Sequence, residues 1–280
     1  MDSPAPTSYL AARTQLRNPP NLIVDMRFSG TVLITGASAG IGEATARAFA
    51  AAGARLVLTA RRRERLEALA AELSQAHGTE CHLLPLDVRD RDGVQAAIGG
   101  LPVEWAAIDV LVNNAGLARG TDKVQAGDPV EWDEVLQTNV NGLLYVTRAV
   151  TPGMVERGRG HVINLGSVAG HEVYPGGAVY CATKHAVGAV TKGLRMDLLG
   201  TGLRVSTVDP GMVETDFSVV RFRGDQERAD NVYRNMTPLT PADIADTIVW
   251  VATRPPHVNV DEIIIKPTDQ ASATLVHRTQ

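Results

Sequence analysis

The stretch Thr31-Val-Leu-Ile-Thr-Gly-Ala-Ser-Ala-Gly-Ile-Gly42 decides the fold class of this chain. It begins with a short apolar, β-branched run typical of a buried strand, and an Ala-rich helical sequence over residues 43–52 follows. Gly36 permits a tight turn, Gly40 lets the backbone approach a pyrophosphate, and Gly42 lets the helix pack on the strand. The free N–H groups of a helix start favour anions. The stretch predicts a dinucleotide cradle, with Ser38 and Ile41 as further contacts, although glycines alone also suit an ordinary turn.

The same alternation of strand and helix continues along the chain. We expect strands at 55–59, 82–86, 108–112, 161–165, 204–208 and 262–266, and helices at 64–77, 91–98, 129–157, 179–199 and 241–251. Strands that alternate with helices indicate parallel βαβ units. We therefore predict an α/β fold with a single doubly wound Rossmann-type domain over residues 26–266, its parallel sheet flanked by helices. Residues 1–25 are predicted to be a disordered N-terminal extension and residues 267–280 a C-terminal tail.

Composition excludes several classes of function. Lys and Arg number 27 against 31 Asp and Glu, a net charge of -4, which disfavours nucleic acid and anionic membranes as partners. Only two cysteines occur and the N-terminal region lacks the apolar run of a signal peptide, so a cytoplasmic location is expected. No two histidines have zinc-like spacing, and we expect no metal site.

Basic residues follow the second predicted strand, at the place where an NAD-binding chain would carry an acid. Arg61 and Arg62 stand there instead, and guanidinium groups suit the 2′-phosphate of NADP. The alternative is a solvated basic turn that pairs with Glu64 or Glu67. Cations are disfavoured at a helix N-terminus, so the phosphate role is the stronger hypothesis.

A tyrosine and a lysine four residues apart carry the candidate chemistry. Tyr180 and Lys184 would share one helix face, where the ammonium can favour the phenolate and lower the pKa of the phenol. Such a tyrosine can act as a general acid or base. Ser167, after the strand 161–165, could donate a hydrogen bond to a substrate oxygen. Taken alone, the Tyr–Lys pair is more typical of an aromatic ring packed under a lysine stem.

Taken together, the motifs resemble the short-chain dehydrogenase/reductase family. They are Thr35-Gly-x-x-x-Gly-x-Gly42, Asn113-Asn-Ala-Gly116, Asn139, Ser167, Tyr180-x-x-x-Lys184 and Pro210-Gly211, and they fall in the family's order and spacing. The resemblance implies that Tyr180 is the catalytic acid/base, that Ser167 polarises the carbonyl, and that Lys184 binds the nicotinamide ribose and tunes Tyr180. It also implies a water held by Asn139 in a proton relay. The further cofactor contacts it implies are Asp87, Val88, Asn113, Ala115, Gly116, Pro210, Gly211, Val213 and Thr215.

A narrower resemblance concerns the substrate. The stretches 101–105, 148–157, 217–225 and 276–278 are similar to bacterial NADP-dependent 3-hydroxy acid dehydrogenases. That likeness implies oxidation of serine, L-allo-threonine or a related 3-hydroxy acid, or reduction of the semialdehyde, by a homotetramer. A small carboxylate substrate needs a cationic partner, for which Arg221 and Arg223 are candidates in a lid-like stretch, with Tyr174 as a wall. The alternatives are two solvated arginines, a reductase of bulkier aldehydes or ketones, and a non-catalytic dinucleotide-binding module.

Overall fold

The computed structural model describes residues 26–279, and its centre is a seven-stranded parallel sheet. The strands are β1 (Thr31–Thr35), β2 (Arg55–Ala60), β3 (Cys81–Pro85), β4 (Ile108–Asn113), β5 (Gly160–Leu165), β6 (Leu203–Pro210) and β7 (Glu262–Ile265). Their order is β3-β2-β1-β4-β5-β6-β7, so the direction of winding reverses between β1 and β4. In such sheets a crevice opens at the carboxyl ends of the strands beside the reversal.

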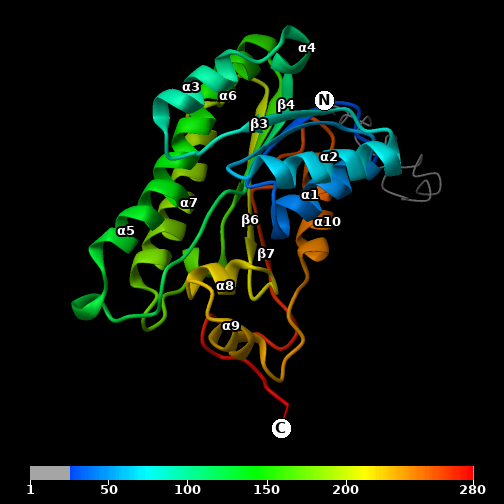
Figure 1. Ribbon diagram of the computed structural model, residues 1–280. Coiled ribbons are helices and arrows are strands. Elements are labelled where there is room, and N and C mark those ends of the chain that lie inside the picture. Colours follow the sequence, from blue (N-terminus) through cyan, green and yellow to red (C-terminus); the bar gives the residue numbers. More distant parts are fainter. Residues whose placement is uncertain (1–25, 280) are drawn as a thin grey trace, which may run out of the picture.

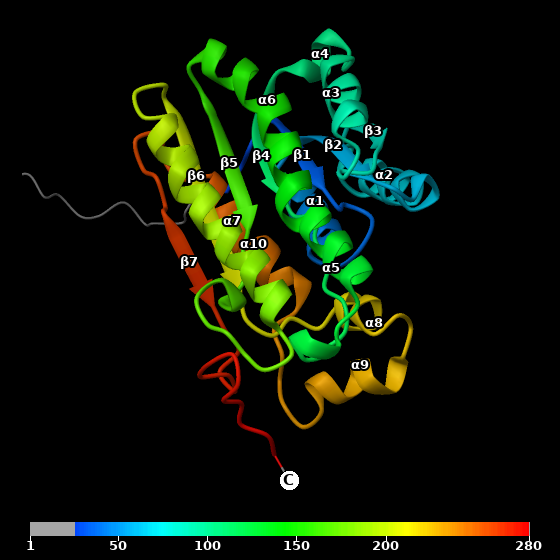
Figure 2. The same cartoon turned by 90° about the vertical axis from the view of Figure 1, so that its left-hand side faces the viewer.

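Helices cover both faces of the sheet. They are α1 (Gly40–Ala51), α2 (Arg63–His77), α3 (Arg91–Gly99), α4 (Val103–Ala106), α5 (Pro129–Leu136), α6 (Leu143–Arg157), α7 (Ala178–Asp197), α8 (Phe217–Arg221), α9 (Gln226–Tyr233) and α10 (Pro241–Ala252). Figure 1 shows α1, α2 and α10 on one face and α3, α6 and α7 on the other. In Figure 2, α6 and α7 lie in front of the strands. The single doubly wound domain predicted from the sequence is confirmed.

Alternate residues of the central strands fill two apolar cores. Val32 and Ile34 of β1 point toward α1 and α10, whereas Leu33 points toward α3 and α6. All five residues of β1 are buried, which explains why its sequence is a continuous apolar run rather than an alternating one. Burial on both faces makes the sheet a rigid base for the loops at its carboxyl edge.

Two parts of the chain differ from the predicted elements. The helical region expected at 129–157 contains a π-helical turn, η3 (Gln137–Gly142), between α5 and α6. The stretch between β6 and α10 contains the short helices α8 and α9, which the sequence pattern did not predict because each is too short to show a period. Both lie below the carboxyl edge of the sheet in Figure 1.

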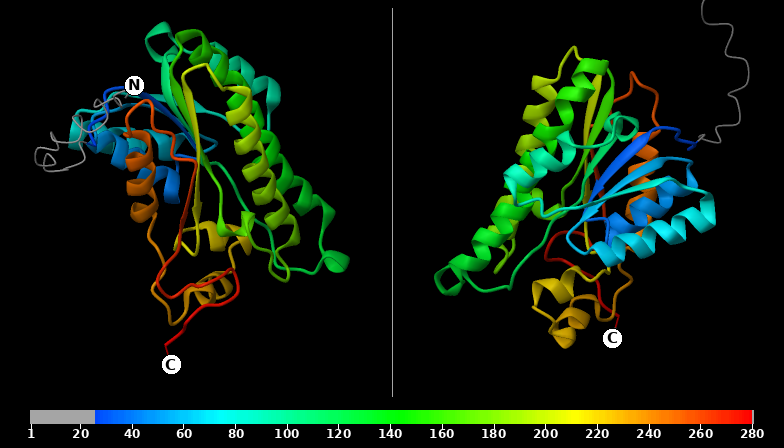
Figure 3. Two further views of the ribbon diagram at one scale, coloured as in Figure 1. Left: turned by 180° about the vertical axis from the view of Figure 1, so that it is seen from behind. Right: turned by 45° about the horizontal axis from the view of Figure 1, so that its top comes forward.

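The chain beyond β7 packs against the domain. Figure 3 shows it running beside α9 at the carboxyl edge of the sheet, and the side chain of Gln270 is 5% exposed. The predicted N-terminal extension, residues 1–25, lies outside the described residues. Within residues 26–279, no helix combines the length and the apolar character that a membrane crossing requires.

Candidate active site

A cavity of about 470 Å³ lies at the carboxyl edge of the sheet. The turns after β1, β2, β3, β4, β5 and β6 supply its walls, together with α7, α8 and part of the chain beyond β7. It sits where the winding direction reverses, as the topology requires. The predicted residues that line it are Gly36, Ser38, Gly40, Ile41, Arg61, Arg62, Asp87, Val88, Ala115, Gly116, Ser167, Tyr174, Tyr180, Lys184, Pro210, Gly211, Val213, Thr215 and Arg221.

The glycine turn after β1 has the conformation that only glycine adopts readily. Gly36 and Gly40 have φ values of 67° and 55°. Gly42 does not line the cavity but fits beneath the turn, because an added Cβ would lie 2.4 Å from the carbonyl oxygen of Gly36. The residue before α1, Ala39, has no side-chain cap, so the first N–H groups of the helix are free to meet an anion.

Asn114 braces this turn and was missed by the sequence prediction, which named its neighbour. Its Nδ2 donates to the carbonyl oxygens of Thr35 and Gly36 at 2.8 and 3.3 Å. Asn113 is 4% exposed and does not line the cavity. The side chain of Asn113 therefore points away from the cavity, because successive side chains of a strand end point to opposite sides of the sheet, and the cofactor contact of Asn113 stays a prediction.

Asn113 belongs instead to a buried polar ladder beneath the site. Its Nδ2 donates to Asn164 Oδ1 and Thr147 Oγ1, both at 2.9 Å. Asn164 Nδ2 donates in turn to Thr191 Oγ1 at 2.9 Å. The ladder ties β4 and β5 to α6 and α7, so it holds the elements that carry the site together.

Three basic residues flank the end of β2. Arg61 is exposed at the cavity wall, and Arg62 Nη2 donates to Ser38 Oγ at 3.0 Å. Burial and the neighbouring Arg65 lower the pKa of Arg62. Arg63 turns away and pairs with Glu67 at 3.8 Å. Two of the three guanidinium groups thus face the cavity and could meet a phosphate.

Ser167, Tyr180 and Lys184 converge on the cavity from two elements. Tyr180 and Lys184 lie one turn apart on α7, and Lys184 Nζ donates to the carbonyl oxygen of Leu165 at 2.8 Å. Ser167 caps the 3₁₀-helix η4 (Val168–Gly170), where its Oγ accepts from the Ala169 N–H at 3.1 Å. The Ser167 hydroxyl donates to the carbonyl oxygen of Pro210 at 3.5 Å.

Burial sets the protonation of the Tyr–Lys pair. It raises the pKa of Tyr180 to about 12, and the charge of Arg221 and a hydrogen bond with Ser167 act against it. It lowers the pKa of Lys184 to about 8, against the attraction of Asp209. The sequence predicted that Lys184 lowers the pKa of Tyr180. That prediction is wrong for this structure, because burial outweighs every neighbouring charge and the opposing cation is Arg221.

The two candidate arginines of the lid have different partners. Arg221 Nη2 donates to Tyr174 Oη at 2.9 Å, and its guanidinium lies 5.1 Å from the centre of the Tyr180 ring. Its Nε is buried and has no hydrogen-bond partner among residues 26–279. Arg223 lies outside the cavity, where it pairs with Glu131 of α5 at 2.7 Å. Of the two arginines, only Arg221 is therefore placed by this structure to meet a substrate in the cavity.

Asn139 lies within the π-helical turn and behind the cavity wall. It is 2% exposed, and its Nδ2 donates to Thr183 Oγ1 at 3.1 Å and to the Leu117 carbonyl at 2.8 Å. A π-turn widens the helix locally and is frequent at functional sites. Asn139 thereby connects η3 to α7 through Thr183, the residue that precedes Lys184.

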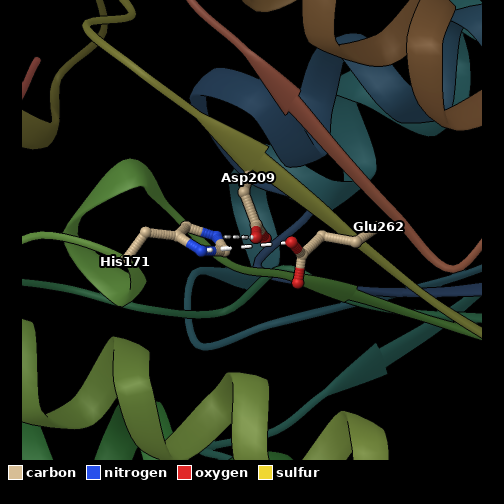
Figure 4. A group of neighbouring side chains, drawn as sticks. All are labelled: His171, Asp209 and Glu262. Carbon is tan, nitrogen blue, oxygen red and sulfur yellow. Dashed lines mark hydrogen bonds and ion pairs between the residues drawn. The ribbon is translucent and has the colours of Figure 1, made fainter.

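Three potential metal ligands come together where η4, β6 and β7 meet, although the sequence gave no reason to expect a metal site. Figure 4 shows the imidazole ring of His171 facing the carboxylates of Asp209 and Glu262. His171 Nε2 lies 2.5 Å from Asp209 Oδ2, and its Nδ1 lies 4.0 Å from Glu262 Oε1. Two donors on one zinc-sized ion are about 3 Å apart or more, given bond lengths of about 2 Å. We interpret the cluster as a hydrogen-bonded ion-pair network that Lys192 joins at 3.9 Å from Glu262.

Comparison with known proteins agrees with this geometry. The short chain dehydrogenase family model matches residues 30–225. The chain belongs to the short-chain dehydrogenase/reductase family. It is 49% identical over 250 residues to the NADP-dependent 3-hydroxy acid dehydrogenase YdfG of Salmonella typhi, covering 89% of this chain and 99% of the relative.

Further members of the family are similarly close. The serine 3-dehydrogenase of Agrobacterium fabrum is 46% identical over 245 residues, covering 88% of this chain and 96% of that enzyme. The closed form of a serine dehydrogenase complexed with NADP+ superimposes with a TM-score of 0.83 at 45% identity. That match covers 89% of this chain and all of the solved one. The resemblance inferred from the motifs is confirmed.

The buried ladder predicts that Asn113 serves stability. Asn113→Ala removes the donor that satisfies Asn164 Oδ1 in the interior, and the free energy of unfolding is expected to fall by about 2–4 kcal/mol. Asn141→Ala, which removes a hydrogen bond to Gln137 on the surface, is the matched control and is expected to change it by less than about 0.5 kcal/mol. Urea denaturation measures both. Equal stability of the two variants would contradict the role of the ladder.

Proposed function

We propose that this protein is an NADP-dependent dehydrogenase that oxidises C3 of a small 3-hydroxy acid such as serine or L-allo-threonine, or reduces the corresponding semialdehyde. The observation that carries the proposal is the convergence of Ser167, Tyr180 and Lys184 with the guanidinium of Arg221 on one cavity. The relatives named as 3-hydroxy acid and serine dehydrogenases support the substrate class.

The cavity fits a phosphorylated dinucleotide. The uncapped start of α1 and the left-handed Gly36 and Gly40 suit a pyrophosphate, which can approach the free N–H groups of the helix. Position 36 requires glycine, because a Cβ there would lie 2.8 Å from Asn114 Nδ2. Arg61 and Arg62 would meet the 2′-phosphate through charge-assisted hydrogen bonds. Asp87 and Val88 line the adenine side of this proposed path, and Pro210, Gly211, Val213 and Thr215 the nicotinamide side. When bound, NADP+ accepts the hydride that leaves C3.

Tyr180 would act as the general base in the oxidation. The phenolate takes the proton of the substrate hydroxyl while C3 loses a hydride, and the C–O bond becomes a carbonyl. Ser167 donates a hydrogen bond to the same oxygen, where negative charge develops. Lys184, with its pKa lowered to about 8, can pass the proton onward through a water held by Asn139. In the reduction the same groups work in reverse.

Arg221 would bind the substrate carboxylate. Its buried Nε lacks a partner among the described residues, and Tyr174 holds the other end of the guanidinium in place. A carboxylate that enters the cavity would satisfy that donor and compensate the cost of leaving water. Because Arg221 also faces the Tyr180 ring, it would place the acid group of a short substrate beside the general base.

Absorbance at 340 nm with a panel of substrates tests the activity. With NADP, we expect turnover of L-serine, L-allo-threonine, 3-hydroxyisobutyrate or 3-hydroxypropionate, and weaker turnover of the corresponding alcohols that lack a carboxylate. Activity confined to bulky aldehydes or ketones would replace the 3-hydroxy acid assignment. NADPH binding without any turnover would favour a dinucleotide-binding module.

The basic pair after β2 predicts the cofactor preference. Arg61→Ala with Arg62→Ala removes two charge-assisted partners of the 2′-phosphate, so KM for NADP is expected to rise by about 10- to 100-fold or more. KM for NAD, which lacks that phosphate, should change little. Arg63→Ala is the matched control, since Arg63 pairs with Glu67 outside the cavity. An unchanged ratio of NADP to NAD efficiency in the double variant would contradict the assignment.

The two lid arginines provide a second matched pair. Arg221→Ala is expected to raise KM for L-serine by about 10- to 100-fold through loss of the carboxylate partner. It should also move the rise of the oxidation rate to higher pH, because Arg221 acts to lower the pKa of Tyr180. Arg223→Ala should leave both quantities near their wild-type values. Equal effects of the two substitutions would refute the clamp.

We further propose a homotetramer in the cytoplasm. Exposed apolar side chains on α5 and α6, namely Leu136, Leu144 and Val155, support an association surface on that pair of helices. The small number of cysteines supports a reducing compartment. Size-exclusion chromatography with light-scattering detection should give four times the mass of one chain. The mass of a single chain would exclude the tetramer.

A further inference from the structure

The chain beyond β7, which we call the C-terminal strap (residues 267–279), carries a buried glutamine that faces the cavity. Gln270 is 5% exposed and lines the cavity beside Gly211 and Met212. Its Oε1 accepts the backbone N–H of Met212 at 2.8 Å, and its Nε2 donates to the carbonyl oxygen of Ser272 at 3.2 Å. Both ends of the carboxamide therefore have defined partners.

The loop after β6 packs closely against this carboxamide. A Cβ on Gly211 would lie 2.2 Å from Gln270 Oε1, so only glycine lets the loop approach the carboxamide. The loop continues to Val213 and Thr215, which line the cavity. Thr215 lies close to the glycine turn, because a Cβ added to Gly40 would lie 3.4 Å from Thr215 Cβ. The loop held by Gln270 thus lies close to the glycine turn across the mouth of the cavity.

The strap itself is fixed at both ends. Near its start, Asp269 Oδ2 accepts the Thr237 N–H at 2.8 Å, and in its middle Ala273 N donates to Glu172 Oε2 at 2.7 Å. At its far end, Arg278 Nη2 donates to the carbonyl oxygen of Val232 in α9 at 2.9 Å. Figure 3 shows the strap alongside α9. Gln270 is therefore presented to the loop from a braced segment.

We infer that Gln270 is a positioning residue for the cofactor: it holds the backbone N–H of Met212 so that the loop after β6 closes over the nicotinamide half of the bound dinucleotide. The inference rests on the proposed NADP dependence. It assigns a role in cofactor affinity to the strap, a segment for which the sequence pattern predicts only a C-terminal tail. Gln270 acts through the Met212 N–H and does not itself take part in proton or hydride transfer.

Fluorescence titration with NADPH tests the inference. Gln270→Met keeps the length of the side chain but has no strong acceptor, so the Met212 N–H loses its partner. The dissociation constant for NADPH is expected to rise by roughly 5- to 30-fold. KM for NADP should rise by a similar factor, whereas KM for L-serine should stay near its wild-type value. Ser272→Ala, which keeps the backbone carbonyl that Gln270 uses, is the matched control and should bind NADPH normally.

A second substitution separates hydrogen bonding from packing. Gln270→Glu retains an acceptor oxygen, so it should bind NADPH more tightly than Gln270→Met does. Should the Met variant fail to fold, Gln270→Asn, whose amide is too short to reach Met212, replaces it with the same expectation. Wild-type affinity in Gln270→Met, or equal losses in the Met and Glu variants, would overturn the inference. Absence of NADPH binding by the wild-type protein would instead refute the proposed function.

Discussion

The hydrogen bond from Lys184 Nζ to the carbonyl oxygen of Leu165 joins the two halves of the candidate site. It attaches α7 to the carboxyl end of β5, and it thereby places Tyr180 beside Ser167, which follows that strand. The buried ladder from Asn113 through Asn164 to Thr191 secures the same elements one layer deeper. The position of the reactive groups is thus fixed by the most buried part of the molecule.

Burial also gives the site its electrostatic character. With its pKa raised to about 12 even beside Arg221, the phenol of Tyr180 is ionised only to a small extent at neutral pH, whereas Lys184, with its pKa lowered to about 8, releases its proton more readily than an ordinary lysine. Arg221 is the cation that acts on Tyr180 in this structure, and in the proposed function it also binds the substrate carboxylate. Specificity and proton transfer would therefore depend on the same guanidinium.

Most of the site could be predicted from the sequence because its residues belong to short motifs beside predictable strands. Gly36, Arg61, Ser167, Tyr180 and Lys184 all follow a strand end or share one helix face, and the parallel sheet brings such positions to one edge.

Other parts depend on contacts that no local pattern encodes. Whether Asn113 or Asn114 faces the cavity depends on where the pleat of β4 ends. Arg221 lines the cavity and Arg223 does not, because the short helix α8 ends between them. The contact of Gln270 with Met212 requires the strap to pack along the carboxyl edge of the sheet, which composition alone could not indicate.

Replacement of Tyr180 by phenylalanine measures the central claim most directly. Phenylalanine keeps the ring that packs against Phe217, with ring centres 5.6 Å apart, and removes only the hydroxyl. The account predicts that kcat for oxidation of the 3-hydroxy acid falls by about 10²- to 10⁴-fold, while the dissociation constant for NADPH stays close to that of the wild type. Turnover close to the wild-type rate with NADPH affinity intact would show that another group carries the proton, and would contradict the account.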